Sequence, residues 1–405
     1  LAGLDLAGVD FSRARLFGAS LAGANLRGAG LLGADLRRAD LSGTKKDRRT
    51  AIPASPRPRP VRRPAAASSL DATPPWKFVV MPDFLNQDID YPDPDWDPTL
   101  DYVLERVAAE RPDFVAVPGD VVMGHWTALG PVGIEAQGAR YYAAWLARMR
   151  AHGLTAYVSP GDHDVGDNPW GPTKRALVDS YEQTFAKHMG MPRNGPAGQD
   201  GLAFSVRHKN LLLVGTNPFE QYRPDGPVAI GVTGTQLSWL ERTLAADDAA
   251  HSVVMGHVPI LPATHRRNTS ALATPGGGGS AQWNALVRGG AALYLAGEYH
   301  DFSAARKDGV TQVVSGALPG VTDEVTYLVV TVHPDRLELD LKSIATTVTV
   351  TGPPPGPSEL PPVRLSLEAD TRRDGPRTLA TMSIDRSGTP SRRSGLFSRR
   401  TRALR

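Results

Sequence analysis

Five short apolar runs in this chain each lead into an acidic residue or a histidine. The polar positions that follow them are, in chain order, Asp83, Asp120, Asp162, His163, Asp164, His257, Glu298 and His300. Glycine precedes four of these five clusters, where it allows the sharp backbone turn needed at a strand end. A buried carboxylate or imidazole is unfavourable unless it is paired or bound to a cation. If the runs are strands that end at one sheet edge, the polar residues after them lie close together. Such a cluster of carboxylates and imidazoles predicts a metal site.

The apolar runs alternate with segments of helical periodicity between Trp76 and about Ser343. Helices are expected at 98–110, 139–152, 173–188, 235–246 and 281–288. A strand pair is expected across 201–214, and closing strands are expected at 310–314 and 327–341. Strands that alternate with helices are typical of an α/β sheet covered by helices. We therefore expect an α/β domain over residues 76–345.

Residues 4–43 repeat with a period of five. A large apolar residue recurs at every fifth position, and a small one stands two residues before it. The large residues are Leu6, Phe11, Leu16, Leu21, Leu26, Leu31, Leu36 and Leu41. Neither a helix nor a strand has this period, so the pattern is typical of a solenoid.

The repeated pattern A(D/N)LxG resembles the pentapeptide repeat family. The resemblance implies a short right-handed quadrilateral β-helix over residues 1–43, with Leu, Phe and Ala side chains pointing inward. Four units make one coil in that family, so the segment would hold about two coils. Stacked repeats bury their faces only against neighbours, which indicates the end of a longer solenoid or a marginal one.

Three further segments differ from these two in composition. Residues 44–75 are rich in proline and arginine and should form an extended, mobile linker. Residues 346–385 contain a few alternating apolar positions after a proline-rich break and are expected to form a small β appendage. Residues 386–405 are rich in Arg, Ser and Gly and should form a disordered basic tail.

The composition and net charge of the chain argue against several functional classes. The 405-residue chain has a net charge of only +3, which is too small to indicate nucleic acid binding. It contains no cysteine, which excludes disulfides, thiolate metal sites and a cysteine nucleophile. No run reaches the roughly 18 apolar residues of a membrane span, and no signal peptide is visible. The chain begins with Leu1, so its natural N-terminus could be missing, and a cytoplasmic location is favoured.

The ordered acids and histidines resemble the calcineurin-like metallophosphoesterase family. The family pattern reads DxH, GD, GNH[D/E], GH and GHxH, and the resemblance covers about two thirds of the chain. It implies a four-layer αββα sandwich with a binuclear metal centre at the carboxyl ends of the strands. It also implies hydrolysis of a phosphate ester, in which two divalent ions about 4 Å apart hold a bridging hydroxide and the substrate phosphate.

The resemblance implies which metal ion each matching residue binds. It implies that Asp120 bridges the two metal ions. It places Asp83 and His300 on the first metal and His257 on the second. The order of these residues along the chain agrees with the family pattern, and each follows an apolar run.

The segment Asp162-His163-Asp164 is expected to carry catalysis as well as metal binding. Three titratable residues directly after an apolar strand are seldom structural. By resemblance, His163 would face the leaving group as proton donor or phosphate contact. Asp164 would follow it as a catalytic residue that orients its imidazole.

Three positions depart from the family pattern. Leu85 stands where the histidine of DxH is expected, and Asn86 or Asp88 could substitute for that ligand. Asp162 replaces the Asn of GNH, and Glu298 replaces the first histidine of GHxH. Both replacements are still metal ligands, and carboxylates favour harder ions such as Mn, Mg or Fe over a nitrogen-rich Zn site. The expected cofactors are two divalent ions from the set Mn, Fe, Zn and Mg.

Two main interpretations of the chain remain open at this stage. The first is a metal-dependent phosphoesterase with a variant binuclear centre. The second is a catalytically degenerate domain that binds a ligand or partner, with the repeats as a docking segment for an unknown protein. Inhibition of topoisomerases by mimicry of DNA is disfavoured, because the repeat segment is short and its arginines balance its aspartates. The sequence does not define the phosphate ester.

Overall fold

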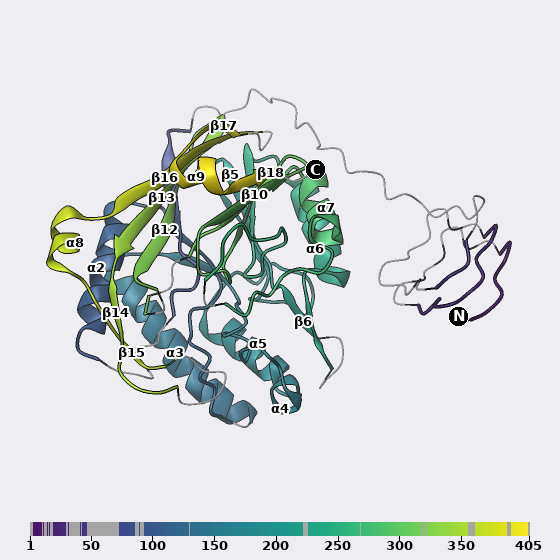
Figure 1. Cartoon of the computed structure of the whole chain (residues 1–405), viewed down its shortest axis with the longest axis horizontal. Helices are drawn as coiled ribbons and strands as arrows, with labels where there is room; N and C mark the ends of the chain where they lie inside the picture. Colours follow the sequence, from purple (N-terminus) through teal and green to yellow (C-terminus); the bar gives the residue numbers. More distant parts are fainter. Residues whose placement is uncertain are drawn as a thin grey trace. The chain divides into compact units, whose positions relative to one another are not determined.

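The computed structural model describes 18 segments of the chain, which divides into two compact units, Leu1–Pro58 and Arg59–Arg405 (Figure 1). The described residues are 3–9, 11, 14, 16, 19–29, 31, 41, 43–46, 73–85, 89, 93–128, 130–221, 226–267, 269–316, 319–320, 322–354, 361–386 and 390–403. Residues 47–72 of the expected linker, and the possible ligands Asn86 and Asp88, lie outside them.

In the smaller unit the chain returns to an equivalent position every 20 residues. A parallel bridge joins Asp5 to Asn25, and another joins Asn25 to Lys45. This spacing equals four five-residue units. Leu21 and Leu26 are fully buried, so the large apolar positions point inward as the repeat predicts.

The larger unit contains two sheets of seven strands each among its described residues. The first sheet holds, in spatial order, β17 (Pro390–Ser394), β16 (Arg377–Asp385), β13 (Arg336–Ala345), β12 (Glu324–Val332), β1 (Trp76–Val80), β2 (Val115–Pro118) and β3 (Ala156–Ser159). The second holds β18 (Thr401–Ala403), β10 (Ser303–Lys307), β11 (Val310–Val314), β9 (Leu293–Ala296), β8 (His251–Met255), β5 (Leu211–Gly215) and β4 (Phe204–His208). Strands β1, β2 and β3 run parallel to one another, and so do β5, β8, β9 and β11.

Two short strand pairs and several helices complete this unit. The pairs are β6 (Phe219–Gln221) with β7 (Val228–Ile230), and β14 (Thr347–Val350) with β15 (Val363–Ser366). The helices are α2 (Trp96–Ala109), α3 (Pro131–Ala151), α4 (Pro172–Arg175), α5 (Val178–His188), α6 (Gly234–Ala246), α7 (Ala281–Arg288), α8 (Ala369–Asp374), α9 (Gly395–Arg400) and the 3-10 turn η2 (Gly277–Gly279). The expected helices are all present, although the one at 173–188 is divided into α4 and α5.

Side-chain alternation along the strands shows how the sheets are covered. In β8, Val253 and Met255 join the core that contains residues of the first sheet, whereas Val254 joins a second core with residues of α6 and α7. Successive strand residues point to opposite faces, so the second sheet lies between the first sheet and these helices. Helices α2 and α3 cover the other side of the first sheet (Figure 1). The result is a mixed α/β fold, as the sequence predicts.

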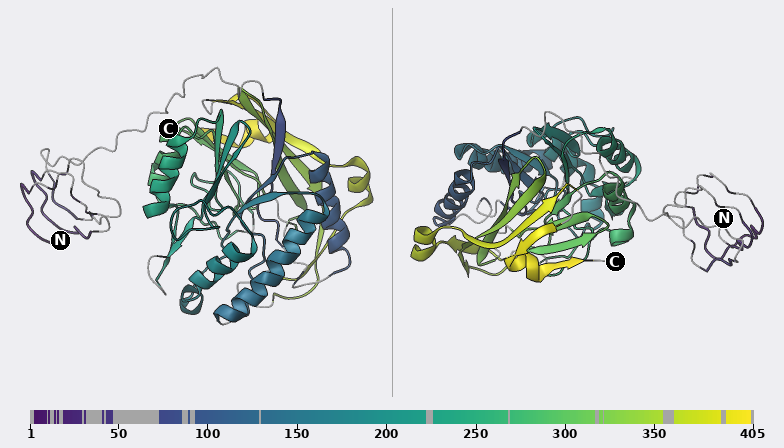
Figure 2. Two further views of the ribbon diagram at one scale, coloured as in Figure 1. Left: turned by 180° about the vertical axis from the view of Figure 1, so that it is seen from behind. Right: turned by 90° about the horizontal axis from the view of Figure 1, so that it is seen from above.

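The C-terminal segments differ from the expectation of an appendage and a disordered tail. Strand β16 pairs with β13, β17 extends the same sheet, and β18 pairs with β10 of the other sheet (Figure 2). Phe397 of α9 is fully buried and packs edge-on against Phe302 with ring centroids 4.8 Å apart. One buried aromatic residue thus anchors a segment whose arginine-rich composition alone suggests disorder.

Strand β15 also packs on the body of the unit rather than standing apart. The indole of Trp96 donates a hydrogen bond to the Val363 carbonyl at 2.9 Å, and Tyr102 donates to the Thr371 carbonyl at 2.9 Å. These bonds tie α2 to β15 and α8. Within the part of the chain that the structure describes, no helix has the length and apolar character needed to cross a membrane.

Candidate metal centre

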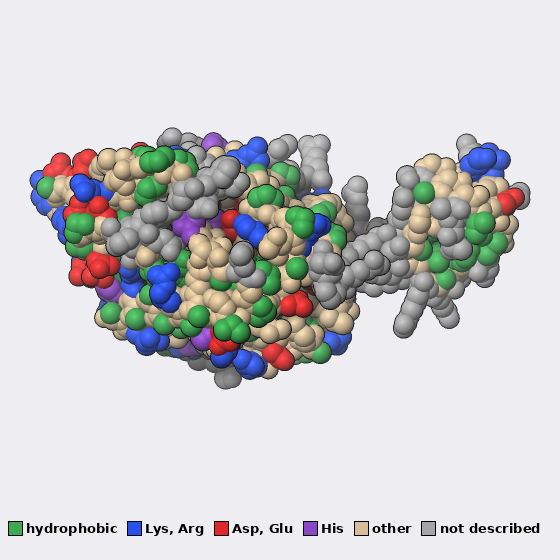
Figure 3. All heavy atoms as spheres, turned by 90° about the horizontal axis from the view of Figure 1, so that it is seen from below, with side chains coloured by type: hydrophobic (Ala, Val, Ile, Leu, Met, Phe, Trp, Pro, Cys, Tyr) green, Lys and Arg blue, Asp and Glu red, His purple; other side chains and the backbone are tan. Residues whose placement is uncertain are grey.

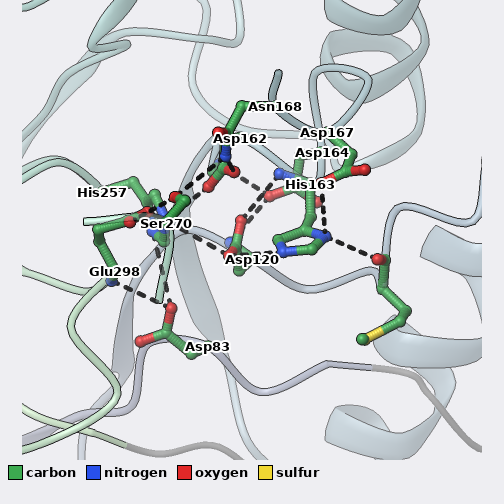
Figure 4. Close-up of polar contacts among 12 residues, drawn as sticks. Asp83, Asp120, Asp162, His163, Asp164, Asp167, Asn168, His257, Ser270 and Glu298 are labelled. Atoms are coloured by element: carbon green, nitrogen blue, oxygen red, sulfur yellow. Dashed lines mark hydrogen bonds and ion pairs between the residues drawn. The ribbon is translucent and has the colours of Figure 1, made fainter. Parts of the chain in front are cut away.

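The parallel strands of both sheets deliver the predicted polar residues to one place. Asp83 follows β1, Asp120 follows β2 and Asp162 follows β3 in the first sheet. From the second sheet, His257 follows β8 and Glu298 follows β9. Figure 4 shows that these side chains point toward one another. On the face drawn in Figure 3, histidine and acidic side chains meet near the middle of the larger unit.

The backbone is unusual where the ligands sit. Asp83, Asp120, Glu298 and His300 all have positive φ angles, between 52° and 68°. Non-glycine residues seldom adopt this conformation, and such residues cluster at functional sites. The chain turns tightly at each strand end, and this brings the side chain back over the sheet edge.

Glycines allow the loops to approach this closely. A Cβ atom at Gly161 would overlap Oδ1 of Asp120, and one at Gly297 would lie 2.9 Å from Oδ2 of Asp83. Neither position therefore accepts a larger residue without displacing a carboxylate of the cluster. The glycines preceding the polar residues in the sequence thus serve close packing as well as turning.

His257 lies at the centre of the cluster. Its Nδ1 donates a hydrogen bond to the Pro118 carbonyl at 2.9 Å, which leaves Nε2 facing the acids. That Nε2 lies 3.0 Å from Oδ1 of Asp162, 3.3 Å from Oδ2 of Asp120 and 3.4 Å from Oε2 of Glu298. All four side chains are at most 3% exposed. One imidazole nitrogen and three carboxylate oxygens thus converge in a buried position.

Asp83 and His300 form the other side of the cluster. Nε2 of His300 lies 3.8 Å from Oδ1 of Asp83, and that oxygen accepts a hydrogen bond from the Glu298 backbone at 3.2 Å. Leu85, at the position of the absent family histidine, is 2% exposed and contributes only an apolar side chain. Asp83 also forms a group of metal-ligand side chains with Asp120 and His257.

His163 stands at the edge of the cluster, where its side chain is 20% exposed. Its Nδ1 donates to the Met123 carbonyl at 2.6 Å and lies 3.5 Å from Oδ1 of Asp167. Its Nε2 lies 4.0 Å from Oδ2 of Asp120. The imidazole is thus held by its Nδ1 side, while Nε2 faces the cluster.

The expectation that Asp164 orients this imidazole differs from what the structure shows. Asp164 is fully buried, and its Oδ2 accepts hydrogen bonds from the backbone of Asp120 at 3.0 Å and of Gly161 at 2.8 Å. It therefore ties together the loops after β2 and β3. Asp167, four residues beyond His163, makes the contact with the imidazole instead, and Lys174 holds Asp167 with a 3.0 Å ion pair.

Two loops form a polar strap over the cluster, made of Asn168, Thr269 and Ser270. Asn168 Nδ2 donates to Oδ2 of Asp162 and, at 3.1 Å, to Oγ of Ser270. The hydroxyls of Thr269 and Ser270 each donate to Oε1 of Glu298 at 2.7 Å. The strap thus links the two carboxylates that replace neutral ligands in the family pattern.

The pKa shifts in the cluster reflect crowded negative charge. Burial, partly offset by His257, raises the pKa of Asp83 to about 7, and burial raises the pKa of Asp120 well above its usual value. Burial disfavours a charged His257, but Asp120, Asp162 and Glu298 outweigh it and raise the pKa of His257 far above its ordinary value. The same balance against neighbouring acids raises the pKa of His163 to about 10. Such a field attracts cations.

The residues present fit a metal ion. His257 Nε2, Asp162 Oδ1 and Asp83 Oδ2 are buried and make no hydrogen bond in the structure. Buried polar atoms without partners are rare, and a cation would satisfy all three. Three groups of metal-ligand side chains arise among the described residues: Asp83, Asp120 and His257; Asp162, His257 and Glu298; and Asp162, His163 and Asp167.

The sequence-predicted ligands Asp83, Asp120, Asp162, His257 and Glu298 therefore come together, with His300 beside Asp83. The strap residues and Asp167 are missing from the prediction. Asp167 and Asn168 closely follow the Asp-His-Asp segment, so their proximity in sequence is a weak signal. Nothing in the sequence marks Thr269 and Ser270, because they lie far from any motif.

Comparison with known proteins agrees with both parts of this description. Residues 1–44 match the pentapeptide repeat family in eight copies, which confirms the prediction from the five-residue period. The chain is 32% identical over 162 residues to tartrate-resistant acid phosphatase type 5 from Rattus norvegicus and from Mus musculus. These 162 residues are 40% of this chain, and the chain spans about half (48%) of the length of these curated relatives. This similarity supports the resemblance to metallophosphoesterases.

Solved structures with a similar fold include two phosphatase-related proteins. A dimetal phosphatase from Danio rerio aligns with a TM-score of 0.44 and 14% identity, over 65% of this chain and 95% of that chain. A structure of PhoD aligns with a TM-score of 0.49 and 13% identity, over 82% of this chain and 74% of that chain.

Proposed function

We propose that this protein is a metal-dependent phosphoesterase that hydrolyses a phosphate ester at a binuclear centre. The observation that carries the proposal is the meeting of Asp120, Asp162 and Glu298 around the free Nε2 of His257, next to Asp83. The proposal includes the αββα arrangement of the larger unit and a quadrilateral β-helix for the repeats. Both acid phosphatase relatives support the reaction class.

Charge supports the presence of two cations. Asp83, Asp120, Asp162 and Glu298 bring four carboxylates into one buried cluster. Their combined charge matches that of two divalent ions, and buried carboxylates without such compensation are strongly unfavourable. When bound, the ions would lower the pKa of water and offset the charge that develops on the phosphoryl oxygens.

Residues of the chain would supply the other functions of the site, which are shared metal binding and proton donation. Asp120, which follows β2 and lies near both Asp83 and His257, would be the carboxylate that holds both ions. His163 is partly exposed and directs Nε2 toward the cluster, so it can donate a proton to a leaving group. Met123 and Asp167 fix its orientation from the Nδ1 side. The neighbouring acids Asp120, Asp162 and Asp167 raise the pKa of His163.

A second candidate is a degenerate domain that binds a ligand or partner, with the repeats as a docking segment. The buried side chain of Leu85 favours this reading, because it replaces a ligand with an apolar group. The supported carboxylates of Asp162 and Glu298 favour the phosphoesterase. The two candidates differ in whether the cluster turns over a phosphate ester.

The test is hydrolysis of aryl phosphate mono- and diesters by protein stripped of metal and refilled with Mn, Fe, Zn or Mg. Asp120→Asn should abolish turnover that depends on metal. Asp248→Asn, at a side chain that is 91% exposed, is the matched control and should leave turnover intact. If no ester is hydrolysed and no metal is retained after refilling, the phosphoesterase proposal is wrong and the binding module remains.

A further inference from the structure

We propose that a cavity near the metal-ligand cluster binds a small organic anion, with an apolar body inside and its oxyanion group at Arg266. The cavity lies between the segment 260–277, which connects β8 to α7, and Tyr299. We call it the loop cavity. The inference goes beyond the proposed function and does not depend on hydrolysis of a phosphate ester.

The loop cavity has the size and apolar lining of a small-molecule site. Its volume is about 650 Å³, within the range of about 300–1,000 Å³ that ligand pockets have. Ile260, Ala263 and Ala271 contribute apolar residues to its wall, and Ile260 is only 1% exposed. Such a wall favours an apolar body, and the volume accommodates a body of the size of naphthalene.

Two buried residues that line the cavity have hydroxyls without partners. Thr274 is 6% exposed, and its Oγ1 is buried without a hydrogen bond. Tyr299 is 3% exposed, and its hydroxyl makes no hydrogen bond with any residue that the structure describes. Burial raises the pKa of Tyr299 to about 12, so this hydroxyl keeps its proton at neutral pH and is able to donate a hydrogen bond. Buried polar groups seldom lack partners, so these two indicate a ligand with acceptor atoms.

The rim of the cavity carries an arginine without a protein partner. Arg266 and His265 are exposed lining residues, and neither side chain forms an ion pair or hydrogen bond with another described residue. Arg267 differs, because its guanidinium pairs with Asp323 at 3.2 Å and it does not line the cavity. A guanidinium binds a carboxylate or another oxyanion through two parallel hydrogen bonds. The unpaired Arg266 therefore favours an anionic ligand.

The loop cavity is separate from the metal-ligand cluster. Tyr299 stands between Glu298 and His300 in the chain, yet of the described residues that line the cavity none is a carboxylate or histidine of the cluster. Ala271 lines the cavity, whereas the hydroxyl of its neighbour Ser270 donates to Glu298 at 2.7 Å (Figure 4). The two sites thus share chain segments and differ in side chains, so the organic anion needs no metal ion to bind.

The test is a calorimetric titration of the full-length protein with 2-naphthoate, which joins an apolar body of suitable size to one carboxylate. We expect about one molecule bound per chain. The neutral 2-naphthalenemethanol, which keeps the body and lacks the charge, should bind about fivefold more weakly, the upper end of what an exposed ion pair contributes. Arg266→Ala should weaken the binding of 2-naphthoate to the same extent and leave that of the neutral alcohol within about twofold.

Three further variants locate the bound anion. Arg267→Ala is the matched control, because it removes the same charge one residue away, and it should leave 2-naphthoate affinity within about twofold. Ala273→Phe places a ring at an exposed position of the cavity wall and should abolish binding. Asp120→Asn alters the cluster alone and should bind 2-naphthoate as the native chain does.

Each outcome supports or overturns the inference. No binding by the native chain, or equal losses in Arg266→Ala and Arg267→Ala, would overturn it, and so would full binding by a folded Ala273→Phe variant. Loss of binding in Asp120→Asn with none in Arg266→Ala would assign the anion to the metal centre instead. Hydrolysis of phosphate esters is measured separately, so the two proposals fail independently.

Discussion

Removing the carboxylate of Asp164 tests whether this residue acts on the loops or on the imidazole. Its Oδ2 accepts two buried backbone hydrogen bonds, from Asp120 and Gly161. Hydrogen bonds to a charged group contribute about 1.5–3 kcal/mol each, so Asp164→Ala should lower the free energy of unfolding by about 3–6 kcal/mol. Asp164→Asn keeps an accepting oxygen without charge and should lose roughly half of that.

Removing the Asp164 carboxylate should also weaken metal binding, because it affects the position of Asp120. Because the Asp120 backbone is held only 3.0 Å from this carboxylate, Asp164→Ala releases the turn that aims the Asp120 side chain at His257. We expect metal affinity to fall about 10- to 100-fold, as for other groups that orient ligands. Urea unfolding of stripped protein, followed by circular dichroism, and calorimetric metal titration measure the two effects.

Asp167→Asn is the matched control, because Asp167 contacts the imidazole of His163 and no backbone amide of the ligand loops. It should leave the free energy of unfolding nearly unchanged and lower turnover of an aryl phosphate. If Asp164→Ala keeps its stability and its metal but loses turnover, the structural role assigned to Asp164 is wrong. It would then act on His163, as the family pattern implies.

Three further predictions concern other parts of the molecule. His163→Gln should retain metal and lose about 10²- to 10⁴-fold in turnover with poor leaving groups, and an equal loss with activated esters would contradict its role as proton donor. Ser270→Ala should weaken metal binding about tenfold in the native chain but not in a Glu298→Gln background. His251 begins β8, at the end of that strand away from the cluster, and burial lowers the pKa of His251 to about 4. The unfolded chain therefore binds the extra proton between about pH 6.5 and 4, and stability falls as pH falls through this window. His251→Gln should flatten that loss in urea unfolding, and an unchanged pH profile would count against the assignment.

The order of polar residues along the chain made the site predictable. Asp83, Asp120 and His257 each follow an apolar run, and parallel strands necessarily bring such positions to one edge. The same reasoning gave the mixed α/β fold. This reasoning depends on local sequence alone, since each polar residue closely follows its own strand.

Contacts between distant segments were not predictable in this way. The C-terminal segment was expected to be disordered from composition, yet Phe397 meets Phe302 in the core, and β18 joins β10. The role of Asp164 was taken from its place beside His163, yet its oxygen faces the backbone of another loop. Periodicity and motif order do not encode which buried atom a carboxylate will reach, because that depends on packing.

The contacts of Asp162 and Glu298 bear on whether the altered motifs reflect decay or adaptation. A carboxylate that replaces a neutral ligand by drift should lack support, because no selection would have placed donors around it. Here Glu298 accepts from Thr269, Ser270 and Leu272, and Asp162 accepts from Asn168. Each carboxylate has one oxygen bound to the strap and the other directed at His257. Such paired support is the arrangement expected of working ligands, and it favours a variant metal centre over a degenerate one.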